Sequence, residues 1–207
     1  MVGGWVDRDK LEIPQDKFIQ HDLEKPFRRD RQFDLVLCLE TAEHISGRNA
    51  GVFVDSLVRL GPIVLFTAAI PFSPGVNHVN EQWPDYWVKL FRDRDYVVVD
   101  CIRRKIWQND RVEWWYRQNL LLFVNRDYLE KNLLLKKEYE NTNINQLALI
   151  HPKNYLDRVK TILGMQQYIT LKRLLRLLPI AIKNSLLKTF KKSTYKQNQI
   201  DPTKTFP

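Results

Sequence analysis

The sequence predicts an α/β protein built around a parallel sheet. Two continuous apolar runs of strand length, residues 33–39 and 63–69, are separated by residues 51–60, whose apolar positions have helical spacing. Strands that are apolar on both sides are typical of a parallel sheet with helices on its two faces. A strand, a helix and a second strand in this order predict a right-handed crossover unit.

Charged and polar side chains follow the first apolar run directly. Glu40, Glu43 and His44 stand at its end, within the sequence Glu-Thr-Ala-Glu-His. In open α/β sheets, the ligand crevice lies beyond the carboxyl ends of the parallel strands. We therefore expect these three side chains at the rim of a crevice.

Length and composition favour one globular domain with an appendage. The chain has 207 residues, of which 44% are hydrophobic and 12% aromatic, which is enough for a core. A charged fraction of 28% and the lack of repeats argue against collagen-like, prion-like and wholly disordered classes. We expect neither a signal peptide nor a membrane span, because no apolar run approaches the ~20 residues that a span needs.

The two cysteines, Cys38 and Cys101, lie in apolar strand-like runs, where a thiol usually behaves as a small buried hydrophobe. They offer no CxxC spacing, so we expect neither a disulfide framework nor a zinc site. A reducing, cytoplasmic location is the corresponding expectation.

The net charge of +9 is distributed unevenly. Residues 152–207 contain twelve Lys and Arg against two Asp, whereas residues 1–151 carry a net charge of −1. This shift in composition predicts a boundary near His151 and Pro152, between a near-neutral body and a basic carboxy-terminal segment.

Further segments complete the predicted secondary structure. Residues 17–23 are predicted as a short strand that ends at Asp22, residues 83–94 as a helix, and residues 96–102 and 119–124 as the last two strands. Leucines at 171, 174, 175 and 178 recur with helical spacing opposite lysines and arginines, which predicts basic amphipathic helices over 171–192. Residues 193–207 are predicted to be disordered.

Three stretches of the sequence carry a family resemblance. They are FDLVLCLETAEHI (33–45), FTAAIPFSPGVNHVNEQWPDYWVKLF (66–91) and WWYRQNLLLFV (114–124). Together they resemble a bacterial subgroup of the class I S-adenosylmethionine-dependent methyltransferase family, over residues 1–124. The resemblance implies a Rossmann-like sheet with strand order 3-2-1-4-5-7-6 and S-adenosylmethionine as the cofactor.

The same resemblance implies an N-terminally truncated domain. The family opens with a strand, a glycine-rich GxGxG turn and a helix that bind the cofactor, and this sequence has no such turn. Aligned through Trp5 and Val6, residues 1–3 fall at the end of the second family strand, and Gly3 stands where an acidic residue binds the ribose. The absent first strand is central, so we expect that a partner fills the gap, that the remaining strands close up, or that the sequence is a fragment.

The resemblance assigns cofactor-binding roles to three residues. Asp22 matches an acid that accepts a hydrogen bond from the adenine amino group, Leu23 would lie beside the adenine ring, and Glu40 would lie near the methionine end. The alternative for Asp22 is a turn aspartate before Glu24-Lys25-Pro26.

Methyl transfer from a sulfonium requires a positioned acceptor and a base. His44 and His78 are the candidate bases, because an imidazole titrates near neutral pH. Either histidine could instead cap a helix or hydrogen-bond a loop. Glu43 could orient His44, although adjacent residues on a helix do not face each other. Together with Glu40 and Glu81 these residues match no recognised metal-binding spacing, and we expect no metal.

Two segments are candidates for substrate binding. Residues 70–84 form a loop that is dense in turn residues yet contains Asn80, Glu81 and Trp83, which suits a lid or substrate loop. Trp115 and Tyr116 belong to an aromatic cluster that either lines a substrate pocket or plugs the end of the sheet.

The leading functional hypothesis is a methyltransferase that acts on a small molecule or a cell-envelope glycan, with residues 171–192 resting on an anionic membrane surface at its inner face. The alternative is a non-catalytic remnant that binds a partner or a membrane through this basic segment. Nucleic acid is less suitable, because leucine-rich helices without interleaved aromatics do not match bases and phosphates. The expected domains are a partial methyltransferase domain (1–126), a helical basic extension (127–192) and a disordered tail (193–207).

Overall fold

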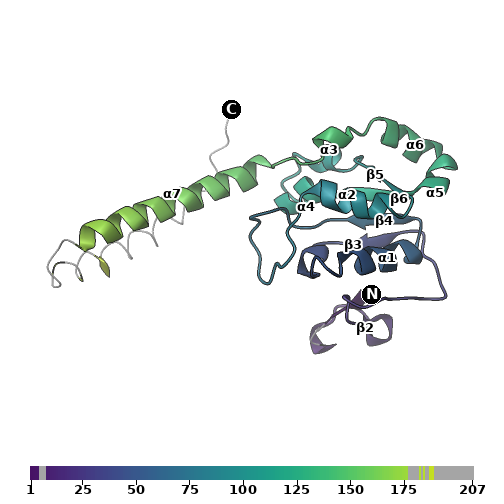
Figure 1. The fold of residues 1–207 in the computed structure, drawn as a ribbon, viewed down its shortest axis with the longest axis horizontal. Helices are drawn as coiled ribbons and strands as arrows, with labels where there is room; N and C mark the ends of the chain where they lie inside the picture. The colour runs from purple at the N-terminus through teal and green to yellow at the C-terminus, as the bar shows by residue number, and fades with distance from the viewer. Residues whose placement is uncertain (5–7, 177–181, 183, 185–186, 189–207) are drawn as a thin grey trace. The chain divides into compact units, whose positions relative to one another are not determined.

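The computed structural model describes residues 1–4, 8–176, 182, 184, 187 and 188 (Figure 1). The chain divides into two compact units, residues 1–154 and residues 155–207. All of the predicted site residues lie in the first unit, whose fold is described below.

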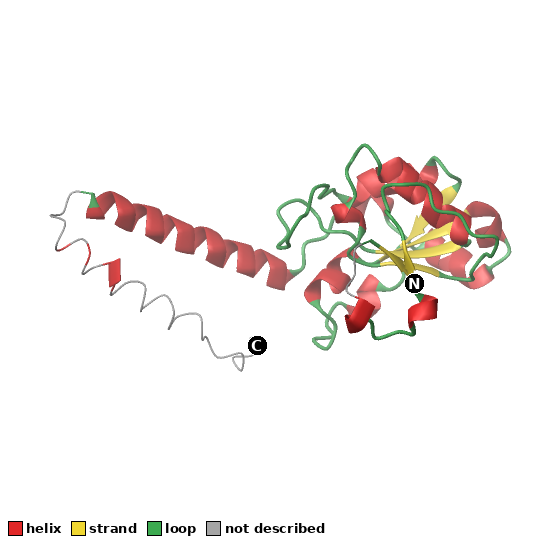
Figure 2. Ribbon diagram, turned by 90° about the horizontal axis from the view of Figure 1, so that it is seen from below, coloured by secondary structure: helices red, strands yellow, loops and turns green. Residues whose placement is uncertain are grey.

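A four-stranded sheet forms the centre of the first unit. Its strands are β3 (Val36–Cys38), β4 (Ile63–Phe66), β5 (Tyr96–Val99) and β6 (Leu121–Asn125), in the order β3-β4-β6-β5. Figure 2 shows the strands in yellow among the helices. β3 and β4 are parallel, with Val36 opposite Val64, and β6 runs antiparallel to both of its neighbours. The prediction that the two apolar runs are neighbours in one sheet is confirmed, although each strand is shorter than its run.

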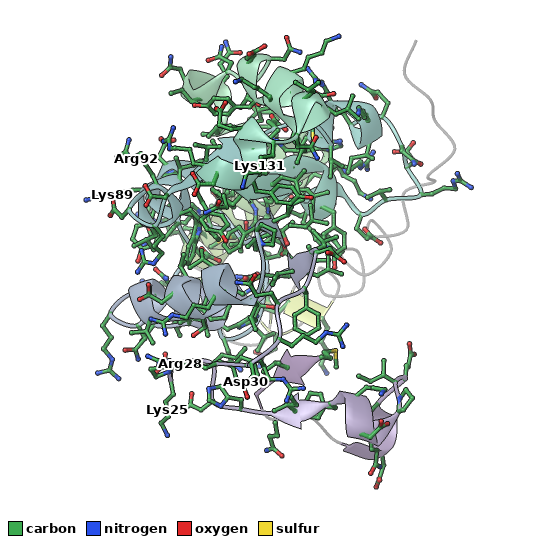
Figure 3. The ribbon with its side chains drawn as sticks, turned by 90° about the vertical axis from the view of Figure 1, so that its right-hand side faces the viewer. Lys25, Arg28, Asp30, Lys89, Arg92 and Lys131 are labelled. Atoms are coloured by element: carbon green, nitrogen blue, oxygen red, sulfur yellow. The ribbon has the colours of Figure 1, made fainter. Side chains whose placement is uncertain are left out.

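Helices cover the two faces of the sheet. On one face, α1 (Ala50–Leu60) and α2 (Pro84–Arg92) pack against the sheet through Phe53, Trp87 and Phe91. On the other face, α5 (Arg126–Glu130) and α6 (Leu133–Glu140) pack against β5 and β6. Consecutive residues of a strand point to opposite faces, which explains why these strands are apolar throughout. The polar side of α2 faces outward, as Lys89 and Arg92 show in Figure 3.

Short elements connect these layers. They are α3 (Arg103–Ile106), α4 (Trp114–Asn119) and four 3-10 turns, η1 (Arg8–Lys10), η2 (Gln15–Lys17), η3 (Ala42–His44) and η4 (Ile144–Gln146). The turn η3 follows β3 directly and holds two of the predicted site residues, Glu43 and His44.

The amino-terminal strands form a separate sheet. β1 (Val2–Gly3) and β2 (Ile19–Gln20) pair in parallel, and neither of them pairs with β3. Within each sheet, the strand neighbours agree with the order that the resemblance implies, and no backbone pairing joins the β1–β2 sheet to β3 in the described residues. The alternative in which the remaining strands close up is therefore wrong for the described residues.

As a result, β3 is an edge strand among the described residues, and one of its two side-chain faces is exposed. β3 pairs with β4 alone, and the side chains of Leu35 and Leu37 are 47% and 61% exposed. Leu37 lies between Val36 and Cys38, which are buried on the α1 side. This face of β3 is apolar but has no covering helix among the described residues.

The division between the two units differs from the predicted domains. The first unit ends at Asn154, later than the predicted boundary after residue 126. Leu129 of α5 and Leu135 of α6 belong to the core on the second face of the sheet, so residues 127–140 are part of the body. The amide side chain of Gln118 fastens the end of this unit, because its Oε1 accepts from the His151 N–H (2.9 Å) and from Asn154 Nδ2 (3.0 Å). The predicted shift in charge near His151 lies close to the end of this unit.

The helix α7 (Pro152–Leu175) begins at this boundary. It contains Leu171 and Leu174 of the predicted basic amphipathic segment, whereas most of residues 177–192 and the predicted disordered tail lie outside the described residues. In the described part of the chain, no helix has the length and apolar character needed to cross a membrane.

Gly61 allows the chain before β3 to approach the end of α1. A Cβ atom at this position would lie 2.1 Å from the carbonyl oxygen of Phe33. The Phe33 N–H donates to the Leu60 carbonyl oxygen at 2.7 Å, which fixes the close approach. Because the obstructing atom belongs to the backbone, a larger residue would displace the entry into β3.

We predict that Gly61→Ala lowers the free energy of unfolding by about 1–3 kcal/mol, the usual cost of forcing extra volume into a packed site. Urea denaturation of the full chain measures this change. Gly164→Ala is the matched control, because a Cβ at Gly164 in α7 meets no atom within 4 Å, and it should not destabilise the chain. Equal stability of Gly61→Ala and the wild type would contradict the assigned role of Gly61.

Candidate functional site

A cavity of about 690 Å³ lies at the carboxyl ends of β1, β2 and β3. It is lined by residues from three segments of the chain: Gly4, Gln20, His21, Asp22, Leu23, Glu24, Thr41, His44 and Ile45. The sequence predicts a crevice beyond the strand ends, and the structure places a cavity there. Its volume is within the range of cavities that bind small molecules and cofactors.

Asp22 is a turn residue that also lines the cavity. Its Oδ1 accepts a hydrogen bond from the Glu24 N–H (3.1 Å), and its carbonyl oxygen accepts from the Lys25 N–H (2.9 Å), so Asp22 is a turn aspartate. It also lines the cavity, together with Leu23. Its Oδ2 forms an ion pair with Lys25 Nζ (3.3 Å), so both carboxylate oxygens have partners within the turn.

Glu24 is a structural residue of the site that sequence reasoning missed. Its Oε1 accepts from the Ser46 N–H (2.8 Å) and its Oε2 accepts from Asn49 Nδ2 (3.0 Å). These contacts connect the segment after β2 to the residues that follow η3, across more than twenty positions of sequence. The only local signal was a turn-like Glu-Lys-Pro, which does not identify the partners.

Two acidic side chains meet behind the cavity wall. Glu40 has a positive φ of 47°, and its N–H donates to Thr67 Oγ1 (2.8 Å) at the end of β4. Glu43 is fully buried, and neither oxygen of its carboxyl group accepts a hydrogen bond from the described residues. Burial, and next the charge of Glu43, raises the pKa of Glu40 to about 7, and burial also raises the pKa of Glu43.

The loop after β4 brings His78 to His44. The two imidazole rings lie 5.1 Å apart, centre to centre, at 73°. His44 Nδ1 donates to the Asn77 carbonyl oxygen (3.1 Å), and His78 Nδ1 is 2.8 Å from Glu81 Oε1. Glu43 makes no hydrogen bond to His44, so its orienting role stays a prediction.

Backbone hydrogen bonds hold this loop against η3. The N–H groups of Val79 and Asn80 both donate to the Glu43 carbonyl oxygen at 3.0 Å. Glu81 Oε2 accepts from the Phe72 N–H (2.7 Å), which closes the loop on itself. The loop thereby places His78, Asn80 and Glu81 beside the residues that follow β3.

Backbone strain is concentrated at the same place. Of the four non-glycine residues with positive φ among those described, three belong to this region: Glu40 (47°), Phe72 (66°) and Asn77 (60°). Such conformations are sparsely populated and cluster at functional sites, where the surrounding structure maintains them. The end of β3 and the loop after β4 therefore share the unusual backbone conformations that are typical of functional sites.

The other predicted substrate-binding residues have different positions. Asn80 is buried, and its Oδ1 accepts from Gln82 Nε2 (2.9 Å). Trp83 is exposed immediately before α2. Trp115 and Tyr116 lie on α4 in ring contact with each other at 6.0 Å, and no ring contact of the described residues joins them to the two histidines.

We predict that Glu24 makes the stability of the first unit pH-dependent. Hydrogen bonds from Ser46 and Asn49 favour the charged carboxylate and hold its pKa below the ordinary value of 4.5. The unfolded chain then binds more protons, so this stabilisation is present above about pH 4.5 and is lost as the pH falls through the folded-state pKa. Glu24→Gln should be less stable than the wild type at pH 7, and the two should converge in acid.

Urea denaturation between neutral and acid pH measures this difference. Glu12→Gln, a change at an exposed glutamate in the same amino-terminal segment, is the control and should follow the wild-type curve. A difference between Glu24→Gln and the wild type that stays constant with pH would show that the charge of Glu24 is not the stabilising factor.

No protein-family model matches the sequence, and no curated protein matches it. Among solved structures, the chain is similar to magnesium protoporphyrin IX methyltransferase (ChlM) from Synechocystis PCC 6803. The match to its structure with SAH has 15% identity and a TM-score of 0.37, and it covers 52% of this chain and 50% of that chain. The match to its structure with SAM has 16% identity and a TM-score of 0.37, and it covers 52% of this chain and 45% of that chain. The chain is also similar to LepI in complex with SAM, with 8% identity and a TM-score of 0.39 over 57% of this chain and 32% of that chain. A pericyclic reaction enzyme matches with 9% identity and a TM-score of 0.35 over 52% of this chain and 30% of that chain. The match spans half or less of each of these chains, and SAM or SAH is bound in three of the four structures.

Proposed function

We propose that this chain binds S-adenosylmethionine and acts as a methyltransferase on a small-molecule or glycan acceptor. The observation that carries the proposal is the cavity at the carboxyl ends of β1, β2 and β3, in which Asp22 and His44 both take part. It has the position that ligands take in open α/β sheets. The family resemblance of the sequence supports the same cofactor.

The cavity walls fit part of this cofactor. Asp22 offers a carboxylate to the adenine amino group, and Leu23 offers an apolar side chain to the adenine ring. Glu40, at the end of β3, would lie toward the methionine end. Glu40 is not among the residues that line the cavity, and Gly3 leaves the ribose without the acidic partner that the family supplies, so Asp22 and Leu23 would contact the adenine end alone.

The histidines supply the proton-accepting group. S-adenosylmethionine provides a methyl group on a positively charged sulfur, so the chain mainly has to position the acceptor and remove a proton. His44 donates from Nδ1 to a carbonyl oxygen, which leaves Nε2 as the basic nitrogen in the neutral ring. His44 lines the cavity and is exposed, so it is the better placed base of the two histidines.

The loop after β4 would contact the acceptor. It exposes a group of large apolar side chains next to the histidines: Phe72, Val76, Val79 and Trp83. Exposed apolar groups on a loop that the fold holds in place suit the binding of a substrate surface. Asn80 and Glu81 would add polar contacts.

We predict that the full chain binds S-adenosylmethionine and S-adenosylhomocysteine in calorimetric titration, and that Asp22→Ala weakens binding about tenfold, since a hydrogen bond to a charged group contributes about 1.5 kcal/mol. Asp22→Asn keeps an oxygen that can accept from the Glu24 N–H and should bind better than Asp22→Ala. Asp16→Ala is the control, because Asp16 is exposed on η2 outside the cavity.

Two results would contradict this assignment. The lack of binding at millimolar cofactor would exclude the methyltransferase function for this chain. Unchanged binding by Asp22→Ala would place the cofactor elsewhere.

A second candidate function is supported by the second unit of the chain. α7 exposes a series of apolar side chains, Leu156, Ile162, Leu163, Ile169 and Leu174, and it also carries exposed Lys160, Lys172 and Arg173. A helix with exposed apolar and basic side chains suits an anionic membrane surface or a partner. In this alternative the chain is a non-catalytic remnant that resides at the inner face of a membrane.

Sedimentation with vesicles separates this candidate from the first. Binding to anionic but not to neutral vesicles, together with no binding of S-adenosylmethionine, would favour the remnant. A labelled oligonucleotide in the same assay tests for nucleic acid, which we expect not to bind.

A further inference from the structure

We propose that Glu43, His44 and His78 form a binding site for a divalent first-row transition-metal ion. One carboxylate oxygen and one nitrogen from each imidazole ring lie within 4.8 Å of one another. Two imidazoles and a carboxylate are a ligand set that zinc and related ions take in proteins, with further positions left open. The methyltransferase function needs no metal, so this site goes beyond it.

The burial of Glu43 and its lack of hydrogen bonds support the proposed metal site. Its side chain is 0% exposed, and both of its carboxyl oxygens lack a hydrogen-bond partner among the described residues. Burying an acidic group without a partner is costly, and folded chains normally provide a hydrogen bond, an opposite charge or a metal. No ion pair of the described residues involves Glu43. Burial raises its pKa, although the Glu40 carboxyl group and the backbone of Ala69 are near enough to lower it in part, and two imidazoles lie within 4.8 Å of it.

The hydrogen bonds of the two histidines are the second support. A carbonyl oxygen of Asn77 accepts from His44 Nδ1, and a carboxylate oxygen of Glu81 accepts from His78 Nδ1. Both acceptors require a proton on Nδ1, so Nε2 carries the lone pair in each neutral ring. A metal-binding histidine typically donates its other N–H to a carbonyl or a carboxylate in this way, which fixes the tautomer and the ring orientation.

The arrangement of the rings fits a shared ion. Two imidazoles on a tetrahedral ion, with metal–nitrogen bonds of about 2.05 Å, have ring centres about 5.2 Å apart, and the observed distance is 5.1 Å. Neighbouring ligand atoms on such an ion lie about 3–3.4 Å apart, so the ligand atoms have to close by one or two ångströms. His44 is exposed and His78 lies on a loop, so both can make this adjustment.

Local packing places His78 for this role. A Cβ atom at Gly75 would lie 2.0 Å from the His78 ring, so the chain at Gly75 passes directly against the imidazole. The N–H groups of Val79 and Asn80 donate to the Glu43 carbonyl oxygen, which connects the backbone beside His78 to the backbone of Glu43. These contacts hold the backbone of the loop beside η3, and the side chains complete the site by closing on the ion.

The site has a buried side and an open side. Glu43 is buried, His78 is half-buried and His44 is exposed and lines the 690 Å³ cavity. An ion here would therefore have coordination positions directed toward solvent and the cavity. If the proposed methyltransferase function holds, on which this one step rests, the ion would hold an oxygen of the acceptor beside the methyl donor and would lower its pKa. The ion would then replace His44 as the group that activates the acceptor, because the Nε2 lone pair of His44 is bound to it.

Metal titration of the full chain, without any cofactor, tests the site. After treatment with a chelator, the wild type should bind one equivalent of Co²⁺, seen in its visible absorption spectrum, and Zn²⁺ should displace it. Glu43→Gln and His78→Ala should each weaken binding at least tenfold. Glu81→Gln, which removes the charged partner of His78, should weaken it about 10–100-fold.

Thermal unfolding separates lost binding from lost folding. Glu43→Gln replaces a buried acid by a neutral group of the same shape, so in chelator it should be at least as stable as the wild type. Zn²⁺ should raise the unfolding temperature of the wild type but not that of Glu43→Gln. Glu12→Gln, a change at an exposed glutamate outside the cluster and the cavity, is the control and should bind and respond as the wild type does.

Two outcomes would overturn the proposal. One is the lack of stoichiometric Co²⁺ or Zn²⁺ binding by the folded wild type. The other is equal affinity of the wild type and Glu43→Gln, which would assign the binding to other groups. Neither outcome depends on S-adenosylmethionine, so the metal site and the methyltransferase function can fail separately.

Discussion

The parallel pairing of β3 with β4 is the constraint on which the rest of the structure depends. After the last paired residues, the Thr67 N–H donates to the Cys38 carbonyl oxygen (2.9 Å), and the Glu40 N–H donates to Thr67 Oγ1 (2.8 Å). The threonine side chain thus extends the ladder by one step and turns the chain at Glu40 into its positive-φ conformation. This turn sends η3 back over the sheet, so that Glu43 lies in the interior and His44 at the cavity.

Much of the fold could be predicted because its signals are local. Two apolar runs separated by an amphipathic helix identified β3, α1 and β4, and the polar residues after β3 identified the edge at which a cavity forms. The inclusion of α5 and α6 in the body was missed, because Leu129 and Leu135 stand among charged residues and show no clear apolar stripe. Their packing depends on the face of β5 and β6 that they cover.

The contacts that make the site were harder to predict because they are not local. Glu24 meets Ser46 and Asn49, and His44 meets His78, over separations of 22 to 34 positions. The chemistry of imidazole identified both histidines as functional candidates, and the sequence placed Glu43 beside His44. It gave no reason to bring His78 to these two residues, since no short metal-binding motif contains all three. The N–H groups of Val79 and Asn80 donate to the Glu43 carbonyl oxygen and so bring His78 next to Glu43 and His44. Backbone contacts of this kind do not depend on the residue type and cannot be predicted from it.

The two halves of the site differ in how firmly the fold holds them. Glu43 and His44 belong to η3, where Glu43 is buried in the interior. The loop that contains His78 is held to η3 by backbone hydrogen bonds. The wall with Asp22 belongs instead to the small β1–β2 sheet, which is fastened through Glu24 and through the Phe27 N–H, which donates to Ser56 Oγ (3.0 Å). Few hydrogen bonds and little shared core hold that wall, so it should open at a lower free energy than the sheet. Any ligand that bridges Asp22 and His44 would connect the two sheets and thereby stabilise the less firmly held wall.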